Sequence, residues 1–303
     1  MNNYTKGSLS LFTARVLSGL NVNAMGYLLP LWIAPIGCVT LRLVFAAVVF
    51  WVIGIFAKPE TIVFNDKLKL FLLGGGGIFG YMSLYAISLS HTTPVSFAVF
   101  NAMQPLWVVI ASAVIFHESI DARKLMGIAV GFVGAMLCIL AEPNRDVADN
   151  PLYGNVLSIA ASIIYAVYLV FSARMVGHLS RMTILRYTFL SAAVVALLFS
   201  WVFGFSAPIF DGDVKVKPLL VLVFVLIFPT VITYFLIPVG LKYLNSTVVA
   251  IYGYVTLIVA SVVSFITGVD KFEPVILWSL LLIGVSIYFV GTAKEVTPEH
   301  RKS

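Results

Sequence analysis

Amide and phenol side chains recur at helical spacing inside long apolar stretches of this chain. Asn101 and Gln104 are three residues apart and Tyr81 and Tyr85 are four apart, so on a helix each pair shares one face. Inside a membrane such groups need hydrogen-bond partners that lipid does not supply. The pattern therefore indicates either bonds between neighbouring helices or a polar cavity that receives a solute.

Candidates for the lining of such a cavity come from both halves of the chain, and they are Asn21, Tyr81, Tyr85, Asn101, Gln104, Tyr165, Tyr168, Tyr234, Tyr252 and Thr256. For any single tyrosine, a bond between helices or a place in the interfacial aromatic belt is the preferred interpretation. For Asn101 with Gln104, adjacent on one face and deep in one stretch, we expect cavity lining.

Three arginines, Arg15, Arg42 and Arg186, lie within two turns of the ends of their apolar stretches. A side chain of that length can reach the membrane interface, and this is the preferred interpretation for all three. The functional alternative is that Arg15 attracts a carboxylate or phosphate on the solute. A neutral cavity would instead suit zwitterions or apolar metabolites.

Titratable groups are sparse where a proton relay would need them. None of the 13 acidic residues falls near the middle of an apolar stretch, and the four histidines lie at stretch ends or in loops. Proton coupling therefore lacks an obvious residue, although a relay through Glu118 or Asp270 stays open. Facilitated diffusion or exchange is favoured.

The sequence lacks the residue patterns typical of a membrane-embedded enzyme or of an ATP-driven transporter. No histidine or carboxylate lies at membrane depth to activate a nucleophile, and no cofactor or metal is expected. Cys38 and Cys138 are not spaced as a metal or redox pair. The glycine run at 74–77 lacks the Gly-Lys-Ser/Thr continuation of a phosphate loop, so we assign it to helix packing.

The elements that carry these residues are predicted to be transmembrane helices. The chain is 61% hydrophobic and only 11% charged, against about 25% charged in soluble domains. Each apolar stretch has enough residues to cross a core of about 30 Å as a helix. The sequence predicts an all-α integral membrane protein with ten spans, at residues 8–28, 35–56, 68–90, 94–116, 124–141, 153–175, 182–205, 217–241, 246–267 and 275–292.

Basic residues predict the orientation of these spans. With the N-terminus inside, 12 of the 19 lysines and arginines fall in inner segments, four in outer segments and three within spans. This asymmetry predicts that both termini are cytoplasmic in a multi-pass protein of the inner (plasma) membrane, with the first stretch retained. The net charge of +6 is thus a topology signal, and no nucleic-acid partner is expected.

The two halves show traces of a duplication. At an offset of 144, Leu41-Arg42 falls on Leu185-Arg186; at 152, Thr93-Pro94 falls on Asn245-Ser246 and Glu118 on Asp270. Five spans per half is an odd number, so the second copy must be inverted in the membrane. The predicted division is a first repeat at 1–143, a connecting loop at 144–150, and a second repeat with a short cytoplasmic tail at 151–303.

These features together resemble the drug/metabolite transporter superfamily, in its EamA-type branch. The resemblance rests on the two five-span halves, on the arginine in the second span of each, and on the run from Thr92 through Gln104-Pro105 to His117-Glu118-Ser119. The chain departs from the family's pattern at 19–23, where a Trp-Gly is replaced, and after Tyr254, where no proline follows. These departures lie where a solute would be contacted.

The resemblance implies a carrier that moves a small organic solute, an amino acid or related metabolite, outward by alternating access through a cavity between the repeats. The alternatives are a channel-like facilitator, or a carrier for phosphorylated, nucleotide-type or drug-like solutes. A membrane-embedded enzyme and a receptor are disfavoured. Membrane lipid and the solute are the expected partners, and a homodimer is compatible but not required.

Overall fold

The computed structural model describes residues 3–57, 60–117, 121–141, 149–175, 179–243, 246–270 and 274–292. Within these ranges every regular element is helical, which confirms the predicted all-α class. The long elements are α1 (Asn3–Leu28), α2 (Pro35–Ile55), α7 (Ala122–Ala141), α8 (Pro151–Met175), α9 (Arg181–Phe203), α12 (Ser246–Thr267) and α13 (Pro274–Thr292).

Three further stretches are helices with a change of geometry along their length. The first is α3 (Phe64–Leu72), the π-helical η1 (Leu73–Phe79) and α4 (Gly80–Leu89); the second is α5 (Pro94–Ala102) with α6 (Gln104–Phe116); the third is α10 (Val216–Val225), the π-helical η3 (Leu226–Ile232) and α11 (Thr233–Tyr243). A short 3₁₀ helix, η2 (Pro208–Phe210), lies in the loop between α9 and α10.

Six of the ten predicted spans meet the length and hydropathy expected of a membrane helix: Pro35–Ile55, Phe64–Leu89, Pro94–Phe116, Pro151–Ser172, Arg181–Phe203 and Val216–Ile237. The other four coincide with α1, α7, α12 and α13, of which the last two contain the shorter apolar runs Val255–Thr267 and Leu277–Ser286. A multi-pass membrane protein is confirmed, and ten crossings stay a prediction.

The two π-helical segments occupy matching places in the two halves. Both η1 and η3 have seven residues and follow the first part of the third helical stretch of their half. In η3, Pro229 lacks the N–H that would normally bond to the Val225 carbonyl, and the Thr230 hydroxyl donates to that carbonyl at 2.7 Å instead. In η1 the glycine run permits the wider turn. π-segments inside helices occur frequently at functional sites.

The break between α5 and α6 has a comparable local cause. Pro105 stands near the start of α6, and Met103 between the two helices has ψ of −5°, against about −42° in a regular α-helix. At its other end α5 is capped by Thr93, the residue before the helix, whose hydroxyl oxygen accepts the Ser96 N–H at 3.3 Å. The second half contributes a further acceptor, because Asp270 Oδ2 accepts the Val95 N–H at 3.2 Å.

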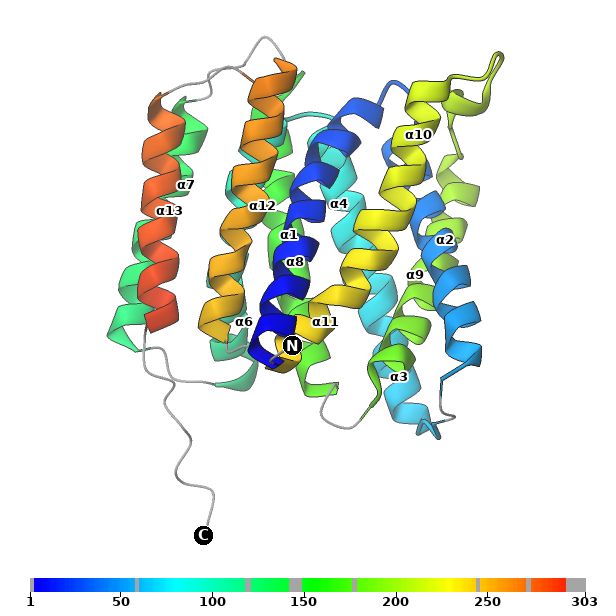
Figure 1. Ribbon diagram of the computed structural model, residues 1–303, viewed down its shortest axis with the longest axis horizontal. Coiled ribbons are helices and arrows are strands. Elements are labelled where there is room, and N and C mark those ends of the chain that lie inside the picture. Colours follow the sequence, from blue (N-terminus) through cyan, green and yellow to red (C-terminus); the bar gives the residue numbers. More distant parts are fainter. Residues whose placement is uncertain are drawn as a thin grey trace.

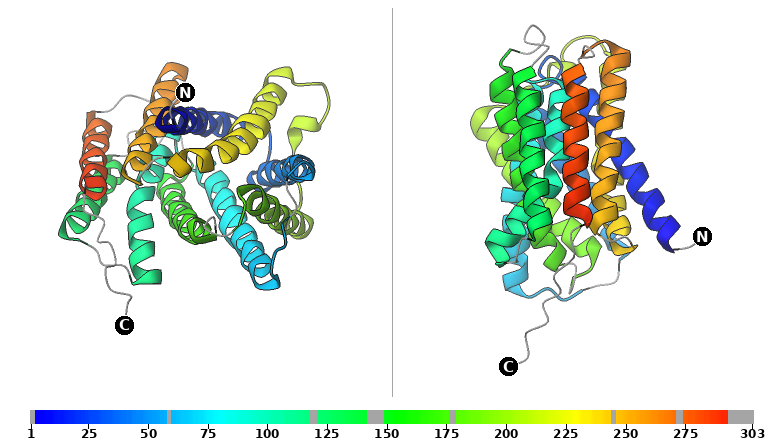
Figure 2. Two further views of the ribbon diagram at one scale, coloured as in Figure 1. Left: turned by 60° about the horizontal axis from the view of Figure 1, so that its bottom comes forward. Right: turned by 90° about the vertical axis from the view of Figure 1, so that its left-hand side faces the viewer.

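The principal packing partners of each half come from the other half. α7 packs against α13, α2 against α9, α1 against α11 and α12, and α8 against α4, α5 and α6. Figure 1 shows the α7–α13 pair at one edge of the bundle, and the views in Figure 2 place it there as well. The core therefore forms at the boundary between the halves rather than inside each one.

The two ends of the bundle can be followed in Figure 1. α1 begins and α13 ends at the lower side, where α3 also begins, whereas α10 begins at the upper side. Large apolar side chains such as Trp201 and Phe203, 84% and 73% exposed, lie on the outer surface, as expected for lipid-facing positions. Three segments used in the topology prediction, at 118–120, 142–148 and 293–303, lie outside the described residues.

Candidate functional site

A cavity lies at mid-depth between the two halves of the bundle. It leaves about 50 Å³ in which the centre of a water molecule can move, enough for a few waters. The lining comes from α1, α2, α4, the α5–α6 break, α8, η3, α11 and α12, and consists of Arg15, Ser18, Asn21, Val22, Arg42, Tyr81, Met82, Tyr85, Asn101, Gln104, Tyr165, Pro229, Thr233, Tyr234, Ile237 and Thr256.

Nine of the eleven predicted site residues line this cavity. The two exceptions are Tyr168, which is buried beside it with its ring 5.7 Å from that of Tyr165, and Tyr252 on α12, which is partly exposed and absent from the lining. The prediction that Asn101 and Gln104 face the same space agrees with the geometry, because they flank the helix break at Met103.

Aromatic rings form one wall of the cavity. The Tyr81 ring lies 4.5 Å from that of Tyr165 and 5.9 Å from that of Tyr85, and Tyr85 in turn packs edge-on against Phe97 at 4.5 Å. Tyr81 directly follows the first residue after η1, and Tyr234 directly follows the first residue after η3, so the two halves present equivalent tyrosines. Such rings offer both apolar faces and hydroxyl groups to a solute.

Several polar atoms at the cavity are buried without a protein partner among the described residues: Arg15 Nε, Asn21 Oδ1, Asn101 Oδ1 and Thr233 Oγ1. Asn21 is held by its other amide atom, since its Nδ2 donates to the Tyr85 hydroxyl at 2.8 Å. Buried polar atoms in proteins are normally paired, and those that are not indicate water or a bound solute. The four atoms therefore describe places where a polar solute can bond.

Arg42 corrects one sequence-based interpretation. We expected it to reach the membrane interface, but it is 3% exposed and lines the cavity. Its Nε donates to Thr230 Oγ1 at 2.9 Å, and its Nη1 lies 3.8 Å from Met25 Sδ. The direction of the side chain follows from packing of α2 against η3, which its distance from the helix end could not reveal.

The other two arginines differ from one another. Arg15, on α1, lines the cavity as the sequence alternative allowed, and its backbone carbonyl accepts the Thr256 hydroxyl at 3.1 Å. Arg186, on α9, lies away from it: its guanidinium stacks 4.3 Å from the Trp51 ring centroid and donates to the Gly54 carbonyl at 3.4 Å. Gly54 is near the end of α2, so an interfacial place suits Arg186.

Sequence reasoning missed several lining residues, which are Ser18, Val22, Met82, Pro229, Thr233 and Ile237. Ser18 precedes Asn21 by one helical turn, and Thr233 directly precedes Tyr234, so helical spacing from the predicted residues could have found both. The apolar members carry no signal of their own. The lining is thus mixed, with an apolar side beside amides, hydroxyls and two guanidinium groups.

Carboxylates lie away from the cavity in the described part of the chain. None lines it, and no group of three or more His, Cys, Asp or Glu residues there is arranged to hold a metal. Asp270, 4% exposed, lies at the end of α12, where the Ser264 hydroxyl donates to it at 2.6 Å. Its contacts tie the two halves together at a helix end, so a structural role accounts for its burial.

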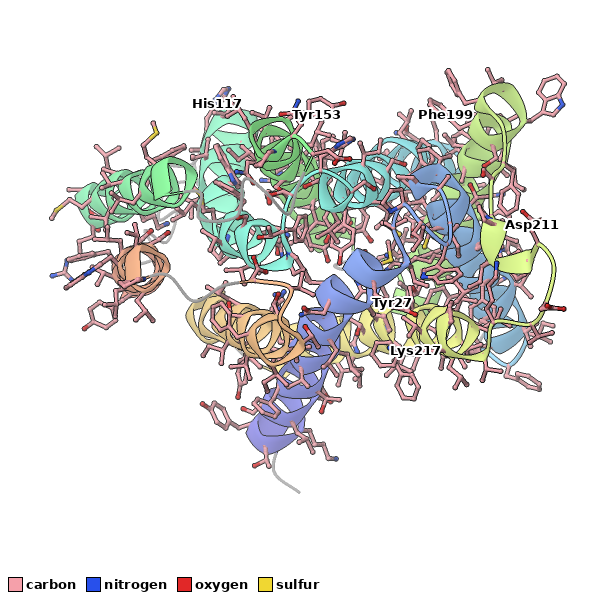
Figure 3. All side chains as sticks on the ribbon, turned by 90° about the horizontal axis from the view of Figure 1, so that it is seen from above. Tyr27, His117, Tyr153, Phe199, Asp211 and Lys217 are labelled. Carbon is pink, nitrogen blue, oxygen red and sulfur yellow. The ribbon has the colours of Figure 1, made fainter. Side chains whose placement is uncertain are left out.

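Cationic side chains also pack on aromatic rings at the upper end of the bundle. Lys217 Nζ lies 5.2 Å from the Tyr27 ring centroid, and Figure 3 shows these two residues next to each other. Lys215 Nζ lies 5.2 Å from the Trp32 ring centroid. These contacts connect the start of α10 to the end of α1.

Known proteins match the chain over nearly its whole length. The model of the EamA-like transporter family matches twice, at residues 5–140 and 152–292. An uncharacterized transporter of Bacillus subtilis, YyaM, is 23% identical over 274 residues and 89% of each chain. An uncharacterized transporter of Archaeoglobus fulgidus is 25% identical over 250 residues and 82% of each chain.

A solved structure supports the fold. A crystal structure covering 94% of this chain and 97% of its own superposes with a TM-score of 0.67 at 19% identity. At that identity the likeness concerns the fold alone. The relatives' names give no solute.

Proposed function

The chain belongs to the EamA-like transporter family, and from that premise we propose that it is a carrier that moves a small organic solute through the cavity between its two halves, without ATP. The observation that carries this proposal is the convergence of polar side chains from both halves on one cavity at mid-depth. Transporters of inverted-repeat construction bind solute at such a boundary. Relatives named as transporters support a carrier rather than an enzyme.

Alternating access supplies the mechanism of this proposal. The cavity admits only a few waters, so a larger solute requires the surrounding helices to separate. The helices that line it are interrupted beside it, at η3 and at Met103, while η1 ends two residues before Tyr81. Interrupted backbone bends at a lower cost than a continuous helix. Bending at these places would open the cavity to one side of the membrane at a time.

For the solute, we propose an amino acid or related metabolite moved outward. The tyrosine faces can contact an apolar group while the amides and unpaired polar atoms bond to a polar one. A phosphorylated solute is the second candidate, and the specific observation in its favour is the presence of two arginines at the cavity. In either case the two repeats, at 1–143 and 151–303, act as the halves that rock against each other.

The test uses purified protein reconstituted into liposomes, with counterflow of labelled amino acids and related organic acids as the readout. We expect saturable, solute-specific uptake, and we expect cells that overproduce the protein to tolerate at least one metabolite or analogue at an otherwise toxic concentration. Flux that rises linearly without saturation would indicate a channel. Proteoliposomes that conduct inorganic ions and move no organic solute would contradict the proposal.

A further inference from the structure

Two arginines from consecutive helices of the first half face one cavity that lacks an acidic counterpart among the described residues. Arg15 on α1 and Arg42 on α2 both belong to the lining, whereas no Asp or Glu does among the described residues. A guanidinium group stays protonated under all ordinary conditions. The cavity therefore carries two positive charges that its own walls do not neutralise.

The hydrogen bonds of these arginines leave donors for a solute. Each guanidinium has five N–H donors arranged as a planar fork. Arg42 uses Nε on Thr230, and the contact of its Nη1 is to the weakly accepting sulfur of Met25. Arg15 Nε is buried without any protein partner in the described structure. Acceptors are needed here, and negatively charged oxygens are the strongest that biological solutes offer.

Arg186 holds the position in the second half that is equivalent to Arg42, and it shows that an arginine at this place in the repeat need not face the cavity. Arg186 stacks on Trp51 and donates to the Gly54 carbonyl, and it is absent from the lining. The difference between the halves makes the charge of the cavity asymmetric. It also provides a matched control residue, an arginine at the same place in the repeat but outside the cavity.

We propose that the transported solute is a small organic dianion, whose carboxylate or phosphate groups are held jointly by Arg15 and Arg42 and whose carbon skeleton contacts the tyrosine wall. An electrically neutral zwitterion would leave both positive charges uncompensated and would bring an ammonium group near them, with no carboxylate of the lining to receive it. This inference rests on the proposed carrier function. Among the solutes considered there, it favours the acidic metabolites and the phosphorylated candidate over neutral amino acids. It makes Arg42 a specificity-determining residue that sequence reasoning placed elsewhere.

The experiment compares probes of different charge on the full-length protein. Binding to purified protein in detergent is measured by calorimetry for succinate, glycerol 3-phosphate, leucine and choline, and transport of the same four is measured in proteoliposomes. We expect succinate or glycerol 3-phosphate to bind at least tenfold more tightly than leucine, and choline not to bind. Succinate alone would identify carboxylates as the recognised groups, and glycerol 3-phosphate alone would identify phosphate.

Variants then test the two arginines. Arg15→Gln and Arg42→Gln should each weaken binding of the preferred dianion by about tenfold to a hundredfold, because each removes a charge-assisted bond. Arg42→Lys, which keeps the charge and loses the fork, should retain part of the affinity. The control Arg186→Gln should leave affinity within about twofold. Thermal unfolding of every variant shows whether a loss of binding comes with a loss of folding. If a variant does not fold, the charge selectivity of the unmodified protein still tests the proposal.

The outcomes distinguish this inference from the broader function. Saturable transport of leucine or choline with no binding of either dianion would overturn the dianion proposal and leave the carrier function standing. Equal effects of Arg186→Gln and Arg42→Gln on affinity in folded protein would also overturn it. No transport of any organic solute across a wider panel would instead remove the carrier function on which the inference rests.

Discussion

Arg42 of the first half donates from Nε to the hydroxyl oxygen of Thr230 in the second half, at 2.9 Å. That same hydroxyl donates its own hydrogen to the Val225 carbonyl at 2.7 Å, where Pro229 cannot. One threonine therefore fixes the direction of a cavity arginine and satisfies the backbone of the π-helical segment η3. The position of a charged group at the cavity and the irregular geometry of a helix are in this way coupled.

Replacing Thr230 with valine, which has nearly the same shape, should remove both bonds. We expect the free energy of unfolding in detergent to fall by about 1–3 kcal/mol, because a buried donor and a buried carbonyl lose their partner. Affinity for the transported solute should fall as well, since Arg42 is no longer held. Thermal unfolding and calorimetry measure the two effects.

The control for this change is Thr267→Val at the end of α12, where the threonine hydroxyl donates to carbonyls of its own helix, those of Val263 and Ser264. Those carbonyls belong to the backbone ladder of a regular α-helix, so the control should change stability by less than about 0.5 kcal/mol. Equal destabilisation by both changes would show that the Arg42–Thr230 bond has no special importance.

The glycine run in η1 should tolerate substitution very unequally. A Cβ added at Gly74 would overlap the Thr188 carbonyl oxygen and the Ser191 hydroxyl on α9, whereas one at Gly76 meets nothing within 4 Å. Gly74→Ala should therefore cost about 1–3 kcal/mol of stability, with Gly76→Ala close to neutral. Thermal unfolding of the two purified variants checks this ordering. A stable Gly74→Ala protein would show that η1 and α9 are less closely packed than the structure indicates.

Orientation in the membrane stays a prediction from charge, and the described ends of the bundle permit a direct test. Asn65 at the start of α3 and Asp213 before α10 lie at opposite ends. With the basic residues inside, a cysteine at Asp213 should react with an impermeant maleimide in intact cells, and a cysteine at Asn65 only after permeabilisation. Cys38 is buried, so it should contribute little background. The reverse labelling pattern would place both termini outside.

Sequence spacing was a better guide to which residues come together than to the direction in which each side chain points. Periodicity placed Asn101, Gln104, Tyr81 and Tyr85 on inward faces, because a polar group inside an apolar helix has few other places to go. It failed for Arg42, where the distance to the helix end was considered and the packing face was not. That face is set by contact between α2 and η3, two elements almost 190 residues apart, and single-sequence periodicity carries no such information.

In the fold as well, local features could be predicted from the sequence and features set by distant contacts could not. Apolar length predicted the helices, because it is a local property of the chain. The break before α6 also has a local cause, since Pro105 stands at the start of that helix. The π-helical geometry of η1 was not predicted, since a run of glycines is compatible with close packing in a regular helix as well. Tyr252 was assigned to the cavity together with Thr256, which is four residues further along the same span, yet only Thr256 belongs to the lining.

Asn101 and Gln104 should act on the solute more than on folding. Asn101 Oδ1 has no protein partner among the described residues, so Asn101→Leu should leave stability nearly unchanged; for Gln104→Met the loss should be about 0.6 kcal/mol, the average for one interhelical bond. Each should weaken solute binding by about 0.5–1.5 kcal/mol per lost hydrogen bond. Counterflow and thermal unfolding on the same preparations compare the two effects.

Asn155 supplies the contrasting case for this pair. It is 1% exposed and accepts the Thr92 hydroxyl at 2.6 Å, outside the cavity lining. Asn155→Leu should therefore lower stability while the affinity of the folded fraction is retained. If transport by Asn101→Leu and Gln104→Met survives and their stability drops, both residues belong to the scaffold, and Tyr81, Tyr85 and Tyr165 become the next candidates.

The charge proposed for the solute predicts an electrical signature of transport. When a dianion crosses without a compensating ion, each cycle moves two negative charges, and about 2.3 kcal/mol is released per charge for every 100 mV of inside-negative potential. Such a potential would by itself drive export, which suits a chain with no carboxylate on its cavity wall among the described residues.

Efflux of the preferred dianion from proteoliposomes should accelerate when a potassium gradient with valinomycin makes the interior negative, and slow when it makes the interior positive. A neutral solute carried by the same protein should show far less dependence. Efflux of the dianion that is indifferent to potential and requires an external anion would instead identify an electroneutral exchanger.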